Sequence, residues 1–398
     1  MNEDRTELYR GRIKSAEAEA ARLGARSRLV SNLRGLSFGT AVVSAIAAVA
    51  SDSPGIWVPL ALVTLGAFLV LVIVHARVLD AEDLAERRVD VNRDALARLT
   101  RDFRALSDAG EGLAPAEHPY ASDLDLFGSA SLFQRLSVAR TRFGRERLAE
   151  LLLSPSALAQ ARTRQAAVRA LANDLELRQR FEAHALGIAG TRRQTDTKLR
   201  VRSAPNPEPL LRWAESPPSL LLDPLSVWGS RLLPPLTLGA LAGYFWFQLS
   251  GVYLAVALAL QAVLVMRAGR ETQRVFGAVS ASEGAFLRYG TLLEIIEGLQ
   301  SEDPCLRGLR DRLKTDAGLP SQAMARFRRW VGWFDLRHNG LIHPFANLLL
   351  MWDIHCTLGL EHWQRAAGKQ LREWFDVIGW FEALSSLASF AADEPHLT

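Results

Sequence analysis

The strongest constraint on this sequence comes from two closely spaced pairs of apolar runs that contain no charged residue. The runs cover residues 36–50, 56–74, 232–249 and 252–266. A helix needs about 20 apolar residues to cross a bilayer core, and a soluble helix of similar length rarely lacks a polar face. We therefore predict two transmembrane helical hairpins, 35–75 and 225–267. A buried hairpin in a soluble core is the alternative for the second pair.

Arginine residues flank the outer ends of both predicted hairpins. They are Arg26, Arg28, Arg34, Arg77, Arg87 and Arg88 around the first, and Arg231, Arg267, Arg270 and Arg274 around the second. Because basic residues stay on the cytoplasmic side of a membrane protein, we predict that both termini and the soluble parts are cytoplasmic. The predicted location is the cytoplasmic membrane, with membrane lipid as a partner. The first thirty residues are polar and charged, which argues against a cleavable signal peptide.

The composition agrees with this class of protein. Of the 398 residues, 49% are hydrophobic, and the net charge at pH 7 is only +4. A chain of this length can hold two or three domains. Cys305 and Cys356 have neither ligand nor redox spacing, which indicates a reducing compartment.

Outside the apolar runs, the apolar residues recur with helical spacing, and the predicted fold is all-α. Residues 1–34 are expected to form a polar helix that is either solvated or lies on lipid headgroups. Residues 76–116 are expected to form a charged connecting helix. A helical core follows in two halves, 117–224 and 268–398, on either side of the second hairpin. Within the second half, residues 344–364 are expected to form one buried core helix.

Residues 118–155 carry the most specific local signals. Ser129 or Ser131 is placed to cap a helix. Gly144 is expected to end that helix, and a second helix is expected to end at Ser154-Pro155.

This stretch resembles the opening of the core helical domain of MutS-type mismatch-repair ATPases. The matching residues are Ser131, Leu132, Leu136, Thr141, Gly144, Arg147, Leu148, Leu152 and Pro155. A second segment, 378–388, resembles the sequence motif at the end of the same core domain. Its matching residues include Glu382, Leu384, Ser386 and Leu387. The likeness is to bacterial MutS-related proteins that carry membrane-spanning segments.

The resemblance implies a core of long helices that acts as a lever between a DNA clamp and a nucleotide-binding domain. It also implies DNA as a partner, a homodimer, and ATP with Mg²⁺ as cofactors of the domain that follows the core. This chain contains no G-x-x-x-x-G-K-[ST] loop and no Phe-x-Glu mismatch-reading motif. We therefore expect no cofactor in this chain, which is either a fragment that ends where the ATPase domain would begin or a product that has lost it. Enzymatic activity stays an open question.

Three clusters of basic residues are candidates for phosphate contact. The densest contains Arg192, Arg193, Lys198, Arg200 and Arg202, and it is the candidate DNA contact. The second contains Arg140, Arg142, Arg145 and Arg147, and the third contains Arg326, Arg328 and Arg329 beside Trp330. Solvated faces or contacts with lipid headgroups are the alternative, because acidic residues nearly balance the basic ones.

Other side chains carry weaker signals. The histidines and cysteine at His338, His343, His355, Cys356 and His362 lack compact ligand spacing, so we expect core histidines and no metal site. Asp123 and Asp125 are expected to form a turn.

Two functions follow from these patterns. The first is the helical core of a membrane-anchored, DNA-binding MutS-like ATPase. The second is a membrane-anchored scaffold that binds a protein partner and has no DNA or ATPase role.

Overall fold

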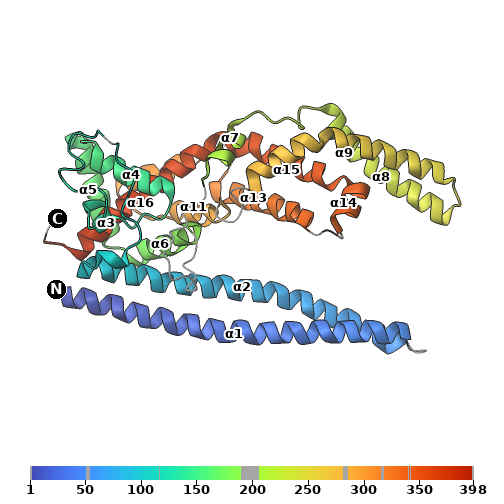
Figure 1. Cartoon of the computed structure of the whole chain (residues 1–398), viewed down its shortest axis with the longest axis horizontal. Coiled ribbons are helices and arrows are strands. Elements are labelled where there is room, and N and C mark those ends of the chain that lie inside the picture. Colours follow the sequence, from blue (N-terminus) through green and yellow to red (C-terminus); the bar gives the residue numbers. More distant parts are fainter. Residues whose placement is uncertain are drawn as a thin grey trace.

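The computed structural model describes residues 2–50, 54–115, 117–189, 206–280, 286–314, 318–338, 340 and 342–396. Across these ranges the chain consists of helices joined by turns and loops, without a β-strand, so the all-α prediction is confirmed. Two helical hairpins leave a helical core and extend toward the same end of an elongated molecule (Figure 1).

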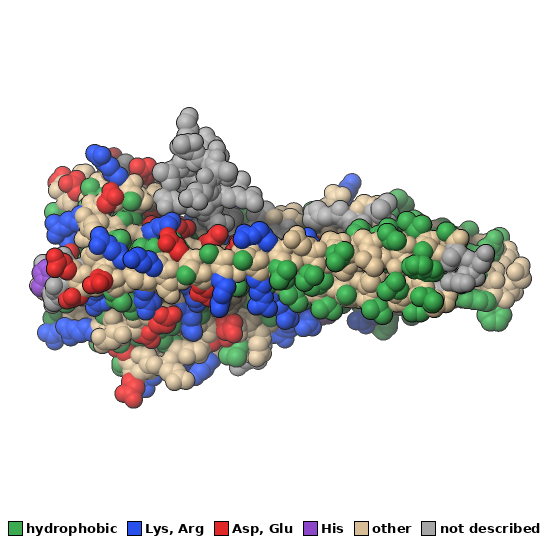
Figure 2. Space-filling model, turned by 90° about the horizontal axis from the view of Figure 1, so that it is seen from below, with side chains coloured by type: hydrophobic (Ala, Val, Ile, Leu, Met, Phe, Trp, Pro, Cys, Tyr) green, Lys and Arg blue, Asp and Glu red, His purple; other side chains and the backbone are tan. Residues whose placement is uncertain are grey.

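Hairpin 1 consists of α1 (Asn2–Ala50) and α2 (Pro54–Thr100), which pack against each other. Each helix continues without a break from the charged part of the sequence into the apolar part. The predicted boundaries at residues 34 and 76 therefore fall inside continuous helices. Figure 2 views the molecule from the side of hairpin 1. Charged side chains gather there at the end nearest the core, and apolar side chains gather toward the other end.

The apolar half of hairpin 1 packs through small residues. Ala41 and Ser44 of α1 are buried, and the rings of Phe38 and Phe68 lie 5.2 Å apart. Small side chains let two helices approach closely, which is how helices commonly associate in lipid. The large side chains point away from this seam: Val49 and Val63 are 90% and 69% exposed.

Hairpin 2 consists of α8 (Pro224–Trp246) and α9 (Gly251–Ser280). Small residues line its seam as well. Ser230 and Thr237 are buried, and their hydroxyls donate to main-chain carbonyls of the preceding turn at 3.0 and 2.9 Å. A side chain at Gly229 would overlap Leu264 of α9.

Three of the described helices, α1, α2 and α9, are long and apolar enough to cross a membrane. The structure thus has helices at these predicted spans whose length and composition suit a membrane. α8 does not meet the same criterion, although it is the partner of α9. Prolines, glycines and aromatic residues take the place of many aliphatic side chains in its sequence.

The core is organised around α16 (Leu371–Asp393). Its neighbours are α4 (Arg142–Leu153), α5 (Leu158–Ala172), α6 (Leu175–Ala189), α11 (Tyr289–Glu297) and α12 (Pro304–Arg312). Phe375, Phe381 and Leu384 are fully buried along α16. A helix that is apolar around most of its circumference belongs in the centre of a bundle, which is where α16 lies (Figure 1).

A second group of helices joins this core to hairpin 2. It consists of α7 (Glu208–Glu215), α13 (Pro320–Phe334), α14 (Ile342–Leu350) and α15 (Trp352–Ala367). The shorter elements are η1 (Phe103–Ala105), α3 (Leu132–Leu136), η2 (Asp335–His338) and η3 (Gly368–Gln370). Trp213 of α7 stacks on Trp363 of α15, with ring centroids 6.2 Å apart.

Two local predictions are wrong. Residues 344–364 do not form one buried helix, because Met351 has a left-handed backbone (φ 51°) and separates α14 from α15. Gly144 does not end a helix: α3 ends well before it, and Gly144 lies in the first turn of α4. Ser131 caps α3 as predicted, and its hydroxyl accepts the N–H of Gln134 at 3.2 Å.

Candidate membrane interface and its polar junctions

The outward faces of the two hairpins carry most of the exposed large hydrophobic side chains among the described residues. In α2, the most apolar stretch has no buried residue at all. In hairpin 2, Met266 is 71% exposed and Phe245 is 66% exposed. Exposed apolar patches of this extent mark membrane or partner contacts in folded proteins. Because the patches follow helices long enough to span a bilayer, we treat them as the candidate membrane interface.

The charged base of hairpin 1 is fixed to the core by polar contacts. The hydroxyl of Tyr9 donates to Asp393 at 2.7 Å. Arg12 lies 3.0 Å from Glu176 and donates to the side-chain oxygen of Gln179 at 2.7 Å. Burial and the neighbouring Asp393 carboxylate raise the pKa of Tyr9 well above its usual value.

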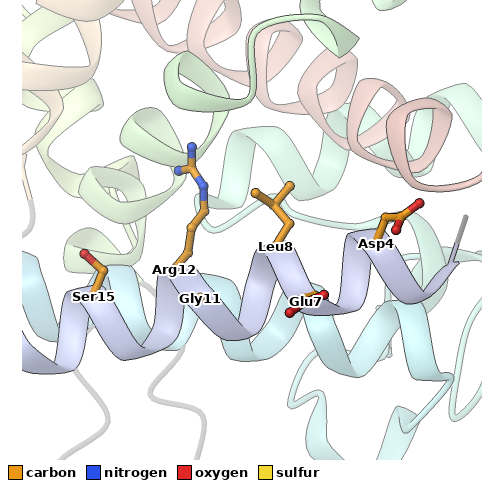
Figure 3. Close-up of a pocket in the computed structure, with 6 residues that line it drawn as sticks. All are labelled: Asp4, Glu7, Leu8, Gly11, Arg12 and Ser15. Atoms are coloured by element: carbon orange, nitrogen blue, oxygen red, sulfur yellow. The ribbon is translucent and has the colours of Figure 1, made fainter.

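A shallow hollow beside this base is lined by one helix only. Its residues are Asp4, Glu7, Leu8, Gly11, Arg12 and Ser15, and all of them belong to α1 (Figure 3). The Arg12 side chain points from α1 toward the core helices, in line with its contacts on α6. A hollow lined by a single helix encloses no ligand, so we assign it no binding role.

A buried ionic cluster continues this attachment. Arg140 lies 2.6 Å from both Asp94 of α2 and Glu182 of α6. Arg98 lies 3.8 Å from Glu182 and donates to the carbonyl of Ser137 at 3.2 Å. Burial lowers the pKa of Arg140, but the two carboxylates outweigh it and raise that pKa overall. Removing one member of such a buried cluster leaves an uncompensated charge.

The two segments that carry the MutS resemblance meet at Glu382 of α16. This buried carboxylate accepts the backbone N–H of Arg140 at 2.9 Å and that of Thr141 at 3.2 Å. It also accepts the hydroxyl of Thr141. A side chain at Gly144 would overlap the Glu382 carboxylate, so the close approach of α4 and α16 requires glycine there. Burial raises the pKa of Glu382, and the hydrogen bonds oppose that shift.

The other residues of the two segments divide into buried and exposed groups. Leu148, Leu384 and Ser386 are fully buried, and the Ser386 hydroxyl accepts the N–H of Val138 at 3.1 Å. Leu387 packs against a small apolar cluster that contains Leu148. By contrast, Leu132 is 39% exposed and Pro155 lies at the surface.

A second buried glutamate fixes the entry to hairpin 2. Glu361 of α15 accepts the backbone N–H groups of Ser219, Leu220 and Leu221 at 3.0, 3.1 and 2.6 Å. Gln364, one turn further on, donates to the carbonyl of Trp213 at 2.6 Å. The sequence analysis did not identify this junction. The sequence signal for it is a glutamate on the same face as Gln364, one turn apart, in a helix that carries several other polar residues.

The candidate DNA-contact residues Arg192, Arg193, Lys198, Arg200 and Arg202 lie outside the described residues. The second basic cluster is described, and its members face carboxylates. Arg142 lies 2.6 Å from Glu146, and Arg145 lies 2.7 Å from Asp108. Arg147 pairs with Asp376, and Arg140 belongs to the buried cluster above. Arg140, Arg145 and Arg147 therefore serve contacts between parts of the core, whereas the pair of Arg142 and Glu146 is exposed on α4.

The histidines have ordinary structural partners where their side chains are described. His343 lies 2.9 Å from Asp353, and His362 bonds through Nδ1 to the carbonyl of Leu358 at 2.7 Å. Cys356 is buried. Among the described residues, no group of three or more potential ligands is placed to hold a metal ion. Asp125 has a left-handed backbone (φ 48°) in a turn, as expected of that loop.

Comparison of this chain with protein-family models, with curated proteins and with solved structures gives no match.

Proposed function

We propose that this chain is a membrane-anchored helical protein whose two hairpins hold the core at the cytoplasmic face of the membrane. Two features support the proposal: the exposed apolar surfaces of both hairpins, and their extension toward the same end of the molecule (Figure 1). Arginines at the base of each hairpin favour the cytoplasmic side for the core.

We further propose that the core is the lever part of a MutS-like protein. The contact of Glu382 with Thr141 carries this proposal, because it joins the two segments whose sequences resemble the start and the end of that core. In this role α16, the last helix of the core, would transmit motion between a nucleotide-binding domain and the rest of the protein. The family's ATP and Mg²⁺ need a phosphate-binding loop, and this sequence has none, so no ATP step is assigned to these residues.

A scaffold without a DNA role is the second candidate function. The ion pairs of Arg145 and Arg147 favour it, because these side chains are already engaged by carboxylates of other parts of the core. A scaffold would use the exposed part of the core to bind a protein partner.

Duplex DNA binding separates the two candidates. The full chain in lipid nanodiscs would be titrated against labelled DNA at several salt concentrations. The MutS-like proposal predicts binding that weakens with salt and is reduced by Arg192→Ala with Arg193→Ala. Arg212→Ala with Arg307→Ala, at exposed arginines of α7 and α12 that belong to none of the basic clusters, provides a control with the same loss of charge. Absence of binding would favour the scaffold. An equal loss in both double variants would show that Arg192 and Arg193 are not the DNA contact.

A further inference from the structure

α14 has its polar side toward the protein and its apolar side outward. Ile342, Phe345 and Leu348 are 53%, 67% and 43% exposed. The opposite side carries His343 and Asn347, which are partly buried. A helix on the surface of a water-soluble protein has the reverse arrangement, with apolar residues against the core.

Polar contacts with Asp353 fix this orientation. His343 Nε2 lies 2.9 Å from the Asp353 carboxylate, and the Asn347 side-chain oxygen accepts the Asp353 N–H at 3.2 Å. Arg337 of η2 also faces Asp353, at 3.8 Å. Rolling α14 to bury its apolar side would break these contacts and expose a 7% accessible aspartate without its partners. The outward apolar face is therefore built into the fold.

The same helix lies against hairpin 2 at the depth of its apolar part. α14 contacts both α8 and α9. The buried amide of Gln261 donates to the carbonyl of Leu349 at 3.4 Å. Gln261 lies ten residues into α9, which is about 15 Å from its start at 1.5 Å per residue. That is roughly half of a hydrocarbon core of about 30 Å.

The break between α14 and α15 also fits a lipid surrounding. Non-helical backbone at membrane depth is tolerated where protein groups satisfy it. Here the Gln261 amide donates to the carbonyl of Leu349, two residues before the break. Met351 at the break is fully buried in the cluster that contains Leu264 and Ala268 of α9. Beside α14, Trp352 donates to the carbonyl of Trp333 at 2.9 Å.

We propose that α14 is a further membrane-inserted element, a short re-entrant helix whose outer face contacts acyl chains in the leaflet nearest the core. The inference rests on the proposed membrane anchoring, since it continues the apolar surface of hairpin 2. A second copy of this chain is a poor occupant of this face. A stable protein interface buries about 800 Å² on each partner, and α14 has only nine residues.

Spin-label accessibility tests the proposal in the full chain reconstituted in nanodiscs. The parent variant carries Cys305→Ser, and Cys356 is 1% exposed and so escapes labelling. Single cysteines would be placed at Leu348 on α14, at Val63 on α2 as the lipid reference, and at Gly308 on α12 as the aqueous reference. All three positions are exposed, so the labels leave the packing intact.

We expect the label at 348 to collide more often with oxygen than with a water-soluble nickel complex, as the label at 63 does. A label at 348 that behaves like the one at 308 would overturn the inference. The inference would also be overturned if the label at 348 were shielded from both reagents and its spectrum were broadened by a second nearby label. That result would mean that a second copy of the chain covers the face. If the label at 63 also behaves as aqueous, the anchoring itself has failed.

Discussion

Glu382 and Thr141 are joined by hydrogen bonds although they stand 241 positions apart in the chain. The carboxylate receives two backbone N–H groups and one hydroxyl at the start of α4. This contact fixes α4 against α16, and the neighbouring Arg140 fixes both to α2 of hairpin 1. Hairpin 1 and the central core helix therefore share one polar junction.

Replacing Glu382 tests how much this junction contributes to stability. Glu382→Ala leaves two buried N–H groups without an acceptor and should lower the free energy of unfolding by about 3 kcal/mol. Glu382→Gln keeps one acceptor oxygen and should cost less. Denaturant unfolding of both variants in detergent measures the difference. An alanine variant as stable as the glutamine variant would mean that the hydrogen bonds contribute little.

Gly144→Ala tests the close approach of α4 to Glu382. The added methyl group would overlap the carboxylate, so we expect a loss of about 1–3 kcal/mol from overpacking. Gly308→Ala on α12 is the matched control, because nothing lies near its added methyl group. That variant should gain up to about 1 kcal/mol through helix propensity. Equal effects of the two substitutions on the thermal midpoint would contradict the predicted overlap.

Removing the Glu361 carboxylate should loosen the entry to hairpin 2. Glu361→Ala withdraws the acceptor from three successive N–H groups, Ser219 to Leu221. We expect a loss of about 1–3 kcal/mol of local stability, which speeds amide hydrogen exchange there roughly tenfold to a hundredfold. Exchange at the Glu382 junction should stay unchanged in the same variant. Uniform acceleration across the core would indicate global destabilisation instead.

His184 of α6 should make stability depend on pH. Burial, with Arg87, Arg88 and Arg180 nearby, lowers its pKa from 6.5 to about 4. The unfolded chain therefore binds a proton at a higher pH than the folded protein does. The contribution of neutral His184 to the free energy of unfolding is therefore fully present above pH 6.5 and is lost as the pH falls toward 4. His184→Asn should flatten this part of the unfolding profile. A profile unchanged by the substitution would contradict the assignment.

The hairpins could be predicted from sequence because a long run without charge has few alternatives to a membrane span. The residues of the Glu382 junction could be named, but their contact could not. Thr141 and Glu382 lie far apart in the chain, and local spacing carries no information about which helices pack together. The contact of Glu361 with the N–H groups of residues 219–221 could not be predicted for the same reason, since they lie 140 to 142 positions away.

α14 shows a different limit of sequence reasoning. Its apolar residues recur with helical spacing, which is the same for a helix facing a protein core and one facing lipid. Only the contacts of His343 and Asn347 with Asp353 reveal which side points inward. The break at Met351 was also hidden, because a left-handed residue is usually glycine or asparagine and methionine gives no such signal.

The most direct test of the account is the position of the hairpin 2 turn relative to the membrane. Ser250→Cys, in the Cys305→Ser parent, would be exposed to a membrane-impermeant maleimide in intact spheroplasts and again after lysis. Gly308→Cys in the core is the control. We predict that the cysteine at 250 is labelled before lysis and the one at 308 only after it. Labelling of both positions only after lysis, or recovery of the protein in the soluble fraction, would contradict a membrane-spanning hairpin with a cytoplasmic core.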